Sequence, residues 1–138
     1  FPGETEKDFL ELESFLKSIP IDHVGVFPYA NEEGAPSESF ADQVPEDEKM
    51  RRRDYLLDVQ SELSATIQKK YIGRVEPVLI EGLSRETDLL LEGRTRYQAP
   101  EVDGCVYIND GVASPGDIVN VHITETQTYD LIGGIAEE

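Results

Sequence analysis

Apolar residues near the start of the chain recur at helical spacing and then give way to a short continuous run. Thr5 is followed three residues later by Asp8, which predicts a capped helix ending near Ser18. The run from His23 to Phe27 is too short for an ordinary helix and rich in β-branched residues, so it predicts a strand that ends at Pro28. Its continuous apolar character is typical of a strand buried on both faces, as in a parallel sheet. The apolar positions of the predicted helix are Phe9, Leu12, Phe15 and Leu16.

Residues 30–43 lack an apolar period and predict a surface loop, after which Pro45 opens a long polar helix that stops before Gly73. Its apolar side is expected to carry Met50, Leu56, Leu57, Leu63 and Ile67. Two helices around one doubly buried strand cannot complete a sheet. We therefore expect residues 1–44 to be the remnant of a larger α/β domain and residues 45–72 to be a connecting helix.

From Gly73 onward, short β-type runs alternate with turn residues. Five such strands in about 60 residues predict a small antiparallel β-barrel over residues 73–138, of Greek-key or meander type. The fold class is therefore α+β. Pro77 predicts an edge position or a bulge, and Gly93 predicts a bulge or a close backbone approach. The predicted strands cover residues 74–81, 88–96, 104–109, 117–124 and 127–133.

The chain is strongly acidic, with 29 acidic against 12 basic residues and a net charge of −17. Few cations remain to neutralise phosphates, which argues against nucleic acid and favours a basic partner, although acidity that only maintains solubility is an equal alternative. The single Cys105 excludes an internal disulfide and is compatible with a reducing, cytoplasmic location. No zinc-ligand spacing, membrane span or signal pattern is present in the sequence.

Several motifs resemble one enzyme family. Phe1-Pro2-Gly3-Glu4-Thr5 and the segment 23–36 resemble the end of the radical S-adenosylmethionine core in methylthiotransferases. Residues 72–82 resemble the first strand of the TRAM domain that follows it. The stretch 93–108, with its Ala-Pro-Glu-Val-Asp-Gly run, is similar to the branch that modifies an aspartate of the twelfth small-subunit ribosomal protein, and differs from the tRNA-modifying branch. Gln98 stands where that branch usually has Asp, which would remove one charge from a docking surface.

The resemblance implies that the complete enzyme is a transferase that uses S-adenosylmethionine and [4Fe-4S] clusters to add a methylthio group to an aspartate β-carbon. Cys105 alone cannot hold a cluster that needs three or four thiolates. We therefore expect this fragment to be catalytically silent, with no catalytic, cofactor-binding or metal-binding residues. The turn from Phe1 to Thr5 is interpreted as a helix cap.

The expected role of the barrel is to dock the basic ribosomal protein, because carboxylates attract cations and tyrosine rings offer cation–π contacts. Asp103, Asp110 and Asp117 could instead be simple turn formers beside glycines. Arg94 and Arg96 are expected to pair with nearby acids. The candidate docking residues are Glu92, Tyr97, Glu101, Asp103, Tyr107, Asp110 and Asp117.

Three roles remain open for the barrel: protein docking, RNA binding as in a tRNA-modifying TRAM module, and structural cover for a core domain. We expect a monomer, with strand exchange between copies through Val24 to Phe27 as the competing outcome. The run Arg51-Arg52-Arg53 is interpreted as a solvated helix face, because acidic residues surround it.

Overall fold

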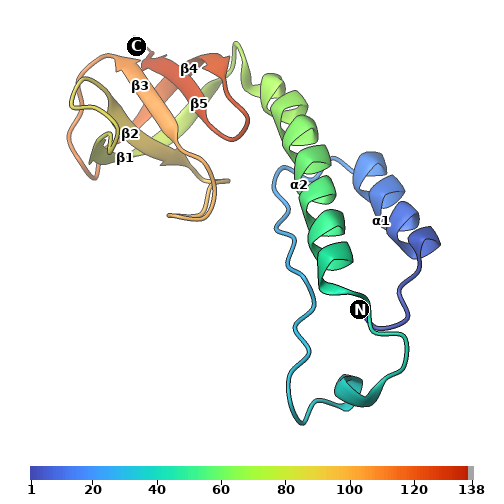
Figure 1. Cartoon of the computed structure of the whole chain (residues 1–138). Coiled ribbons are helices and arrows are strands. Elements are labelled where there is room, and N and C mark those ends of the chain that lie inside the picture. Colours follow the sequence, from blue (N-terminus) through green and yellow to red (C-terminus); the bar gives the residue numbers. More distant parts are fainter. Residues whose placement is uncertain (137–138) are drawn as a thin grey trace. The chain divides into compact units, whose positions relative to one another are not determined.

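The structure, a computed structural model, describes residues 1–136 and divides the chain into two compact units, Phe1–Leu63 and Ser64–Glu138. The boundary falls inside the long helix α2, which therefore contributes residues to both units. Figure 1 shows the order of the elements. They are α1 Glu6–Ser18, η1 Pro36–Ser39, α2 Glu46–Gln68, η2 Lys69–Tyr71, β1 Val75–Leu83, β2 Leu91–Thr95, β3 Val106–Asp110, β4 Ile118–Thr126 and β5 Leu131–Ile135.

Helix α1 begins where the sequence predicts. The Thr5 hydroxyl oxygen accepts a hydrogen bond from the Asp8 backbone N–H at 3.3 Å, and the Asp8 carboxylate accepts one from the Thr5 N–H at 2.8 Å. This reciprocal capping box satisfies two backbone donors that the first turn leaves open. The helix lies beside α2, and Phe9 and Leu16 pack with Leu56 as the core of this unit (Figure 1).

The predicted strand at residues 23–27 is not a strand in this chain. The segment is extended, and Val24 and Val26 pack against the helices while Gly25 and Phe27 are exposed. Its side chains thus alternate as in a strand, with only one face covered. A strand also needs a neighbouring backbone for its hydrogen bonds, and no strand pairs with this segment among residues 1–136. The prediction of burial on both faces is therefore wrong here.

The most buried side of α2 differs from the predicted apolar side. Of the five predicted apolar residues only Leu56 is fully buried, and the next three buried positions at four-residue spacing are Gln60, Ser64 and Gln68. The Gln60 side-chain amide donates to the carbonyls of Ile21 and Asp22. Amide side chains are buried here because they satisfy backbone carbonyls of irregular segments, which a hydrophobic period does not record.

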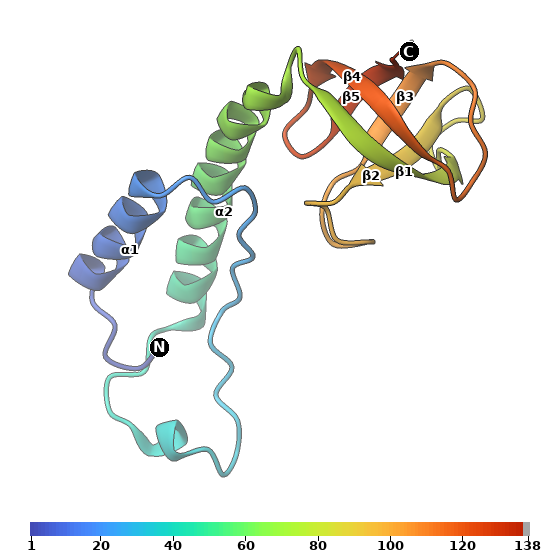
Figure 2. The same cartoon turned by 180° about the vertical axis from the view of Figure 1, so that it is seen from behind.

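The five strands form a closed barrel in the order β1-β2-β3-β5-β4, with β4 returning to pair with β1 (Figures 1 and 2). The predicted small five-stranded barrel and the α+β class are confirmed, and four neighbouring pairs are antiparallel as predicted, but β3 and β5 pair in parallel. Neighbours cannot alternate in direction all the way around a ring with an odd number of strands. Closure with five strands therefore requires at least one parallel pair, and the order found is that of a Greek-key barrel of OB type.

Alternate residues of the strands point inward and form the barrel core. Val78, Ile80, Val106, Val121 and Ile123 are each at most 1% exposed, and Tyr71 from η2 packs against them. This period of two explains why each predicted strand overlaps an observed one. The other members of the core are Ile108 and Leu131.

Both special positions predicted in the barrel strands are confirmed. Pro77 pairs with Asn120 of β4, but β1 starts to pair with β2 only at Val78, so the missing N–H of Pro77 lies on an unpaired edge. A Cβ atom on Gly93 would lie 2.5 Å from the Leu79 carbonyl oxygen, which shows the close backbone approach.

Candidate functional site

A depression of about 240 Å³ opens on one side of the barrel. Its lining brings together the end of β1, the middle of β2, the β1–β2 loop, the β2–β3 loop and the β4–β5 loop. The lining residues are Glu81, Arg85, Glu92, Arg94, Ala99, Pro100, Glu101, Asp103, Gly104, Cys105 and Asp130.

The position of this depression matches the place where barrels of this type bind their ligands. OB-type barrels use the face of strands 2 and 3 together with the loops β1–β2 and β4–β5. Here β2 contributes Glu92 and Arg94, the β1–β2 loop contributes Arg85, and the β4–β5 loop contributes Asp130. The barrel topology, rather than nearness in sequence, therefore assembles the candidate site.

The depression carries more negative than positive charge. Five of its lining residues are carboxylates and two are arginines, a formal balance of −3. A phosphate backbone would meet this surface with net repulsion, whereas a lysine or arginine side chain would find acceptors on several sides. The arrangement suits a cationic group.

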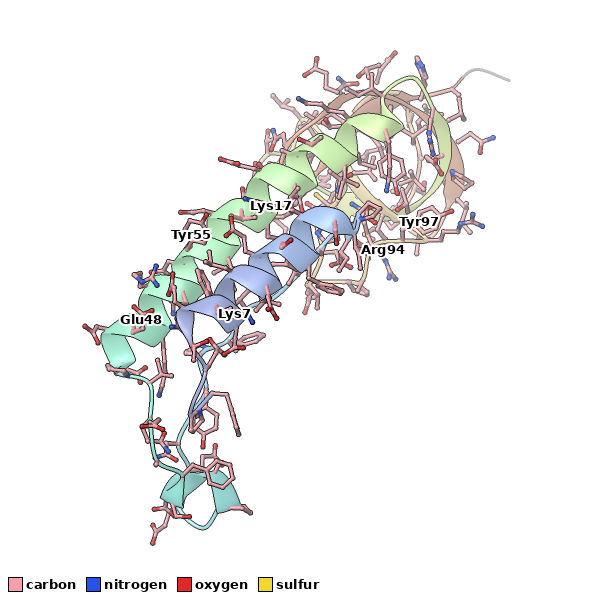
Figure 3. All side chains as sticks on the ribbon, turned by 90° about the vertical axis from the view of Figure 1, so that its right-hand side faces the viewer. Lys7, Lys17, Glu48, Tyr55, Arg94 and Tyr97 are labelled. Carbon is pink, nitrogen blue, oxygen red and sulfur yellow. The ribbon has the colours of Figure 1, made fainter. Side chains whose placement is uncertain are left out.

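Two ion pairs cross the depression. The carboxylate of Glu81 lies 3.0 Å from Arg94 Nε, and Glu81 is the extra residue of a β-bulge, because Ile80 and Gly82 pair with consecutive residues of β2. The bulge re-aims the Glu81 side chain across to β2. The Arg85 guanidinium lies 3.4 Å from Glu101, and both side chains are 76% exposed. Figure 3 shows Arg94 and Tyr97 on the barrel. Intramolecular pairing is confirmed for Arg94.

The loop between β2 and β3 is shaped by side chains that bond to its own backbone. The Gln98 side-chain oxygen accepts hydrogen bonds from the Thr95 N–H at 3.0 Å and the Thr95 hydroxyl at 3.1 Å. Gln98 is only 7% exposed, so the expectation that it removes a charge from the docking surface is wrong. The Asp103 carboxylate accepts from the Ala99 N–H at 2.7 Å. Glu101 adopts a positive φ of 62°, a conformation that is uncommon outside glycine.

The structure groups only part of the seven predicted docking residues. Glu92, Glu101 and Asp103 line the depression. Tyr107 pairs with Glu92 across the β2–β3 ladder, and its hydroxyl is hydrogen-bonded to Cys105, which lines the depression. The remaining three residues do not line it, and the docking role of all seven stays a prediction.

Those three residues lie on other parts of the barrel. The Asp117 carboxylate accepts from the Ser114 N–H at 2.8 Å, which matches the turn-former alternative. Tyr97 stacks with Arg96, whose guanidinium carbon lies 4.7 Å from the ring centre, and its hydroxyl is hydrogen-bonded to the same guanidinium. Asp110 ends β3 and is exposed. Asp103 fits both interpretations, because it braces a turn and also lines the depression.

Sequence reasoning missed Glu81, Arg85 and Asp130. Asp130 accepts a hydrogen bond from the Cys105 N–H at 2.9 Å and so fixes the start of β3 next to the β4–β5 loop. The one available signal was Gly82, whose position after Glu81 in an alternating strand is typical of a bulge.

The Cys105 thiol, which lines the depression, has low nucleophilic reactivity. Burial raises the pKa of Cys105 to about 12, against the opposing effect of its hydrogen bond with Tyr107. The thiol is therefore protonated near neutral pH and is a poor nucleophile. The hydrogen bond with Cys105, and then burial, raise the pKa of Tyr107 as well. Tyr107 therefore offers a neutral aromatic ring.

The arginine run on α2 is paired with neighbouring acids. Arg51 keeps 50% of its side chain exposed, as the solvated-face interpretation expects, but that interpretation is wrong for Arg52, whose side chain is only 11% exposed. Arg51 pairs with Glu48 at 2.7 Å, and Arg52 pairs with both Glu48 and Glu4 at 2.7 Å. Arg52 also donates to the Glu4 backbone carbonyl and so fixes the turn from Phe1 to Thr5 against α2. Figure 3 marks Glu48 near the start of α2.

The described residues do not fit a metal cluster. Among residues 1–136, no three His, Cys, Asp or Glu side chains are arranged to hold a metal ion. The sequence has one cysteine, whereas an iron–sulfur cluster bound through thiolates needs three or four. None of the helices in the same residues combines the length and the apolar character that crossing a membrane requires.

Comparison with known proteins gives two findings. Residues 72–135 match the family model described as the TRAM domain. Over 98% of its length the chain is 60% identical to a protein from Desulfotalea psychrophila named ribosomal protein uS12 methylthiotransferase RimO. A protein of the same name from Syntrophotalea carbinolica is 50% identical over 100% of the chain, and one from Anaeromyxobacter sp. strain K is 50% identical over 97% of it. The chain spans about 30% of the length of these relatives.

Proposed function

The chain belongs to the uS12 methylthiotransferase family RimO, and from this premise we propose that the acidic depression of its TRAM barrel docks the basic protein substrate of the complete enzyme. That enzyme would add a methylthio group to the β-carbon of an aspartate of uS12 in the cytoplasm. The observation that carries the docking role is the placement of five carboxylates on the ligand-binding face of an OB-type barrel.

Electrostatics supports this assignment. Proteins that bind ribosomal RNA neutralise its phosphates with lysine and arginine, so such a protein presents cations to any enzyme that modifies it. A surface with the opposite charge speeds the encounter and selects the orientation. The barrel would hold the target aspartate where the reacting centre can reach one C–H bond, which is a positioning role.

The chemistry itself is assigned to other parts of the complete enzyme. S-adenosylmethionine and [4Fe-4S] clusters would generate the radical and supply the sulfur there, since residues 1–136 hold no fitting ligand set. We propose no catalytic residue in this chain.

We further propose that residues 1–44 close the radical S-adenosylmethionine core, that residues 45–72 connect it to the barrel, and that residues 73–138 form the docking domain. The extended segment at Val24 to Phe27 supports this division, because it has one packed face and no strand partner among residues 1–136. The exposed fractions of Phe15, at 51%, and Phe27, at 88%, also suit a unit that packs against further protein.

A binding experiment tests the docking role. The chain is expected to bind purified uS12 at low salt, with an affinity that falls as salt rises, because exposed charges are screened within a Debye length of about 10 Å at 0.1 M ionic strength. Absence of binding at low salt, or an affinity that salt leaves unchanged, would contradict electrostatic docking.

RNA binding is the second candidate, because the barrel has the strand order of oligonucleotide-binding folds. A mobility-shift assay with transfer RNA and ribosomal RNA separates the two functions. A shift with RNA, together with no binding of uS12, would favour this alternative.

A further inference from the structure

Arg85 connects two carboxylates of the depression from a loop between them. Its backbone N–H donates to Glu92 at 3.3 Å, and its guanidinium pairs with Glu101 at 3.4 Å. Glu92 belongs to β2 and Glu101 to the β2–β3 loop, so one residue of the β1–β2 loop engages both of these acids. A guanidinium of the protein itself thus lies where the proposed function places a cation of the substrate.

The two arginines of the depression are held very differently. Arg94 extends from a strand and lies 3.0 Å from Glu81, with 31% of its side chain exposed. Arg85 extends from a loop, and its guanidinium lies 3.4 Å from the Glu101 carboxylate, with both side chains 76% exposed. Exposed pairs of this kind contribute little net free energy, because water and salt compete for both partners. The Arg85–Glu101 pair can therefore open without disturbing the barrel.

We propose that Arg85 is a displaceable internal occupant of the depression, whose guanidinium pairs with Glu101 until an arginine side chain of the protein substrate replaces it. This inference rests on the proposed docking function and adds a regulatory residue to the same site. Docking then exchanges one guanidinium–carboxylate pair for another, which lowers the affinity for a single cation. It favours a partner that presents several cations and can engage Glu92 and Asp103 at the same time.

Three forms of the 138-residue chain test the inference by their affinity for purified uS12 at low salt: wild type, Arg85→Gln and Arg74→Gln. The control removes the same charge from an exposed residue that does not line the depression. Arg85→Gln is expected to bind about two- to five-fold more tightly than Arg74→Gln, the range that corresponds to the loss of one exposed competing pair. Equal affinities of the two variants would overturn the role of Arg85 while leaving docking intact.

A second measurement keeps the inference testable if uS12 does not bind, a result that would contradict the docking function. Nα-acetyl-argininamide is titrated into the wild-type chain while the side-chain Nε–H resonances of Arg85 and Arg74 are followed by NMR. The Arg85 resonance is expected to shift as Glu101 changes partner, the Arg74 resonance to stay in place, and uncharged Nα-acetyl-glutaminamide to have no effect. An Arg85 resonance that does not respond to the arginine compound, or responds equally to both compounds, would overturn the inference.

Discussion

At position 93 the barrel has room for a hydrogen atom and nothing larger. A Cβ atom there would lie 2.5 Å from the Leu79 carbonyl oxygen and 2.7 Å from Val78 Cγ1, and both neighbours belong to the paired strand β1. Gly93→Ala is expected to lower the free energy of unfolding of the barrel by about 1–3 kcal/mol, since β1 and β2 must move apart. Urea denaturation followed by the methyl NMR signals of Ile80 measures the loss. Stability equal to that of the exposed control Asn120→Ala would contradict the packing argument.

Gln98 is the residue at which analogy with a family misleads most clearly. Its side chain is buried and bonds to Thr95, so Gln98→Ala is expected to destabilise the barrel by about 1–3 kcal/mol, because it leaves the Thr95 N–H without its acceptor. Affinity for uS12 measured where the variant is folded should be unchanged. Gln127→Ala, on an exposed residue of the β4–β5 loop, is the matched control. A weaker docking affinity without a loss of stability would restore a surface role for Gln98.

Residues whose role depends on near neighbours were predictable from the sequence. Thr5 with Asp8, Pro77 and Gly93 each follow a local rule of backbone chemistry. Glu81 and Asp130 were not predictable in this way, because they are 49 positions apart in the sequence and only barrel closure brings them to one depression.

The helical elements are joined by a cluster of charges that should respond to acid. Hydrogen bonds from Arg51 and Arg52 lower the pKa of Glu48 from the ordinary 4.5 to about 2. Because the folded form favours the carboxylate, this stabilisation is present in full above about pH 4.5 and is lost as the pH falls toward 2. The difference in melting temperature between wild type and Glu48→Gln should therefore shrink over this range.

Circular dichroism at 222 nm, recorded at pH 6, 4, 3 and 2, measures that difference. Glu11→Gln is the matched control, because Glu11 is an exposed helical acid whose partner Lys7 lies 3.7 Å away. A difference for Glu48→Gln that is the same at pH 6 and pH 2 would contradict the assigned cause.

At the scale of elements, the sequence predicted where the helices and the barrel strands lie, because capping and turn residues mark the helix ends and an apolar period of two marks the strands. The apolar period did not predict the buried side of α2, where Gln60, Ser64 and Gln68 are buried. Two elements escaped this reasoning. The segment at Val24 to Phe27 carries the composition of a strand without a partner in this chain, and pairing is not a property of one segment. The parallel pair β3–β5 follows from the closure of five strands, which concerns all of them together.

At the scale of the whole molecule, the amino-acid composition gives the net negative charge, and the strand order of the barrel decides where part of that charge is concentrated. A net charge of −17 does not by itself establish a basic partner, since the same charge also maintains solubility. The barrel converts part of it into five carboxylates around one depression. Glu92, Glu101 and Asp103 could be named from the sequence as candidates, but their grouping required the strand order.

The most direct test of the docking role is the affinity for purified uS12, at low salt, of two double variants with equal net charge. Glu92→Gln with Glu101→Gln neutralises two acids of the depression, while Glu76→Gln with Glu125→Gln neutralises acids of β1 and β4 that do not line it and are not among the candidate docking residues. The first variant should bind uS12 about 5- to 30-fold more weakly than wild type, because it loses two partly exposed charge pairs with the substrate. The affinity of the second variant should stay within about two-fold of wild type. Equal losses in both variants, or no loss in the first, would contradict a docking site at this depression.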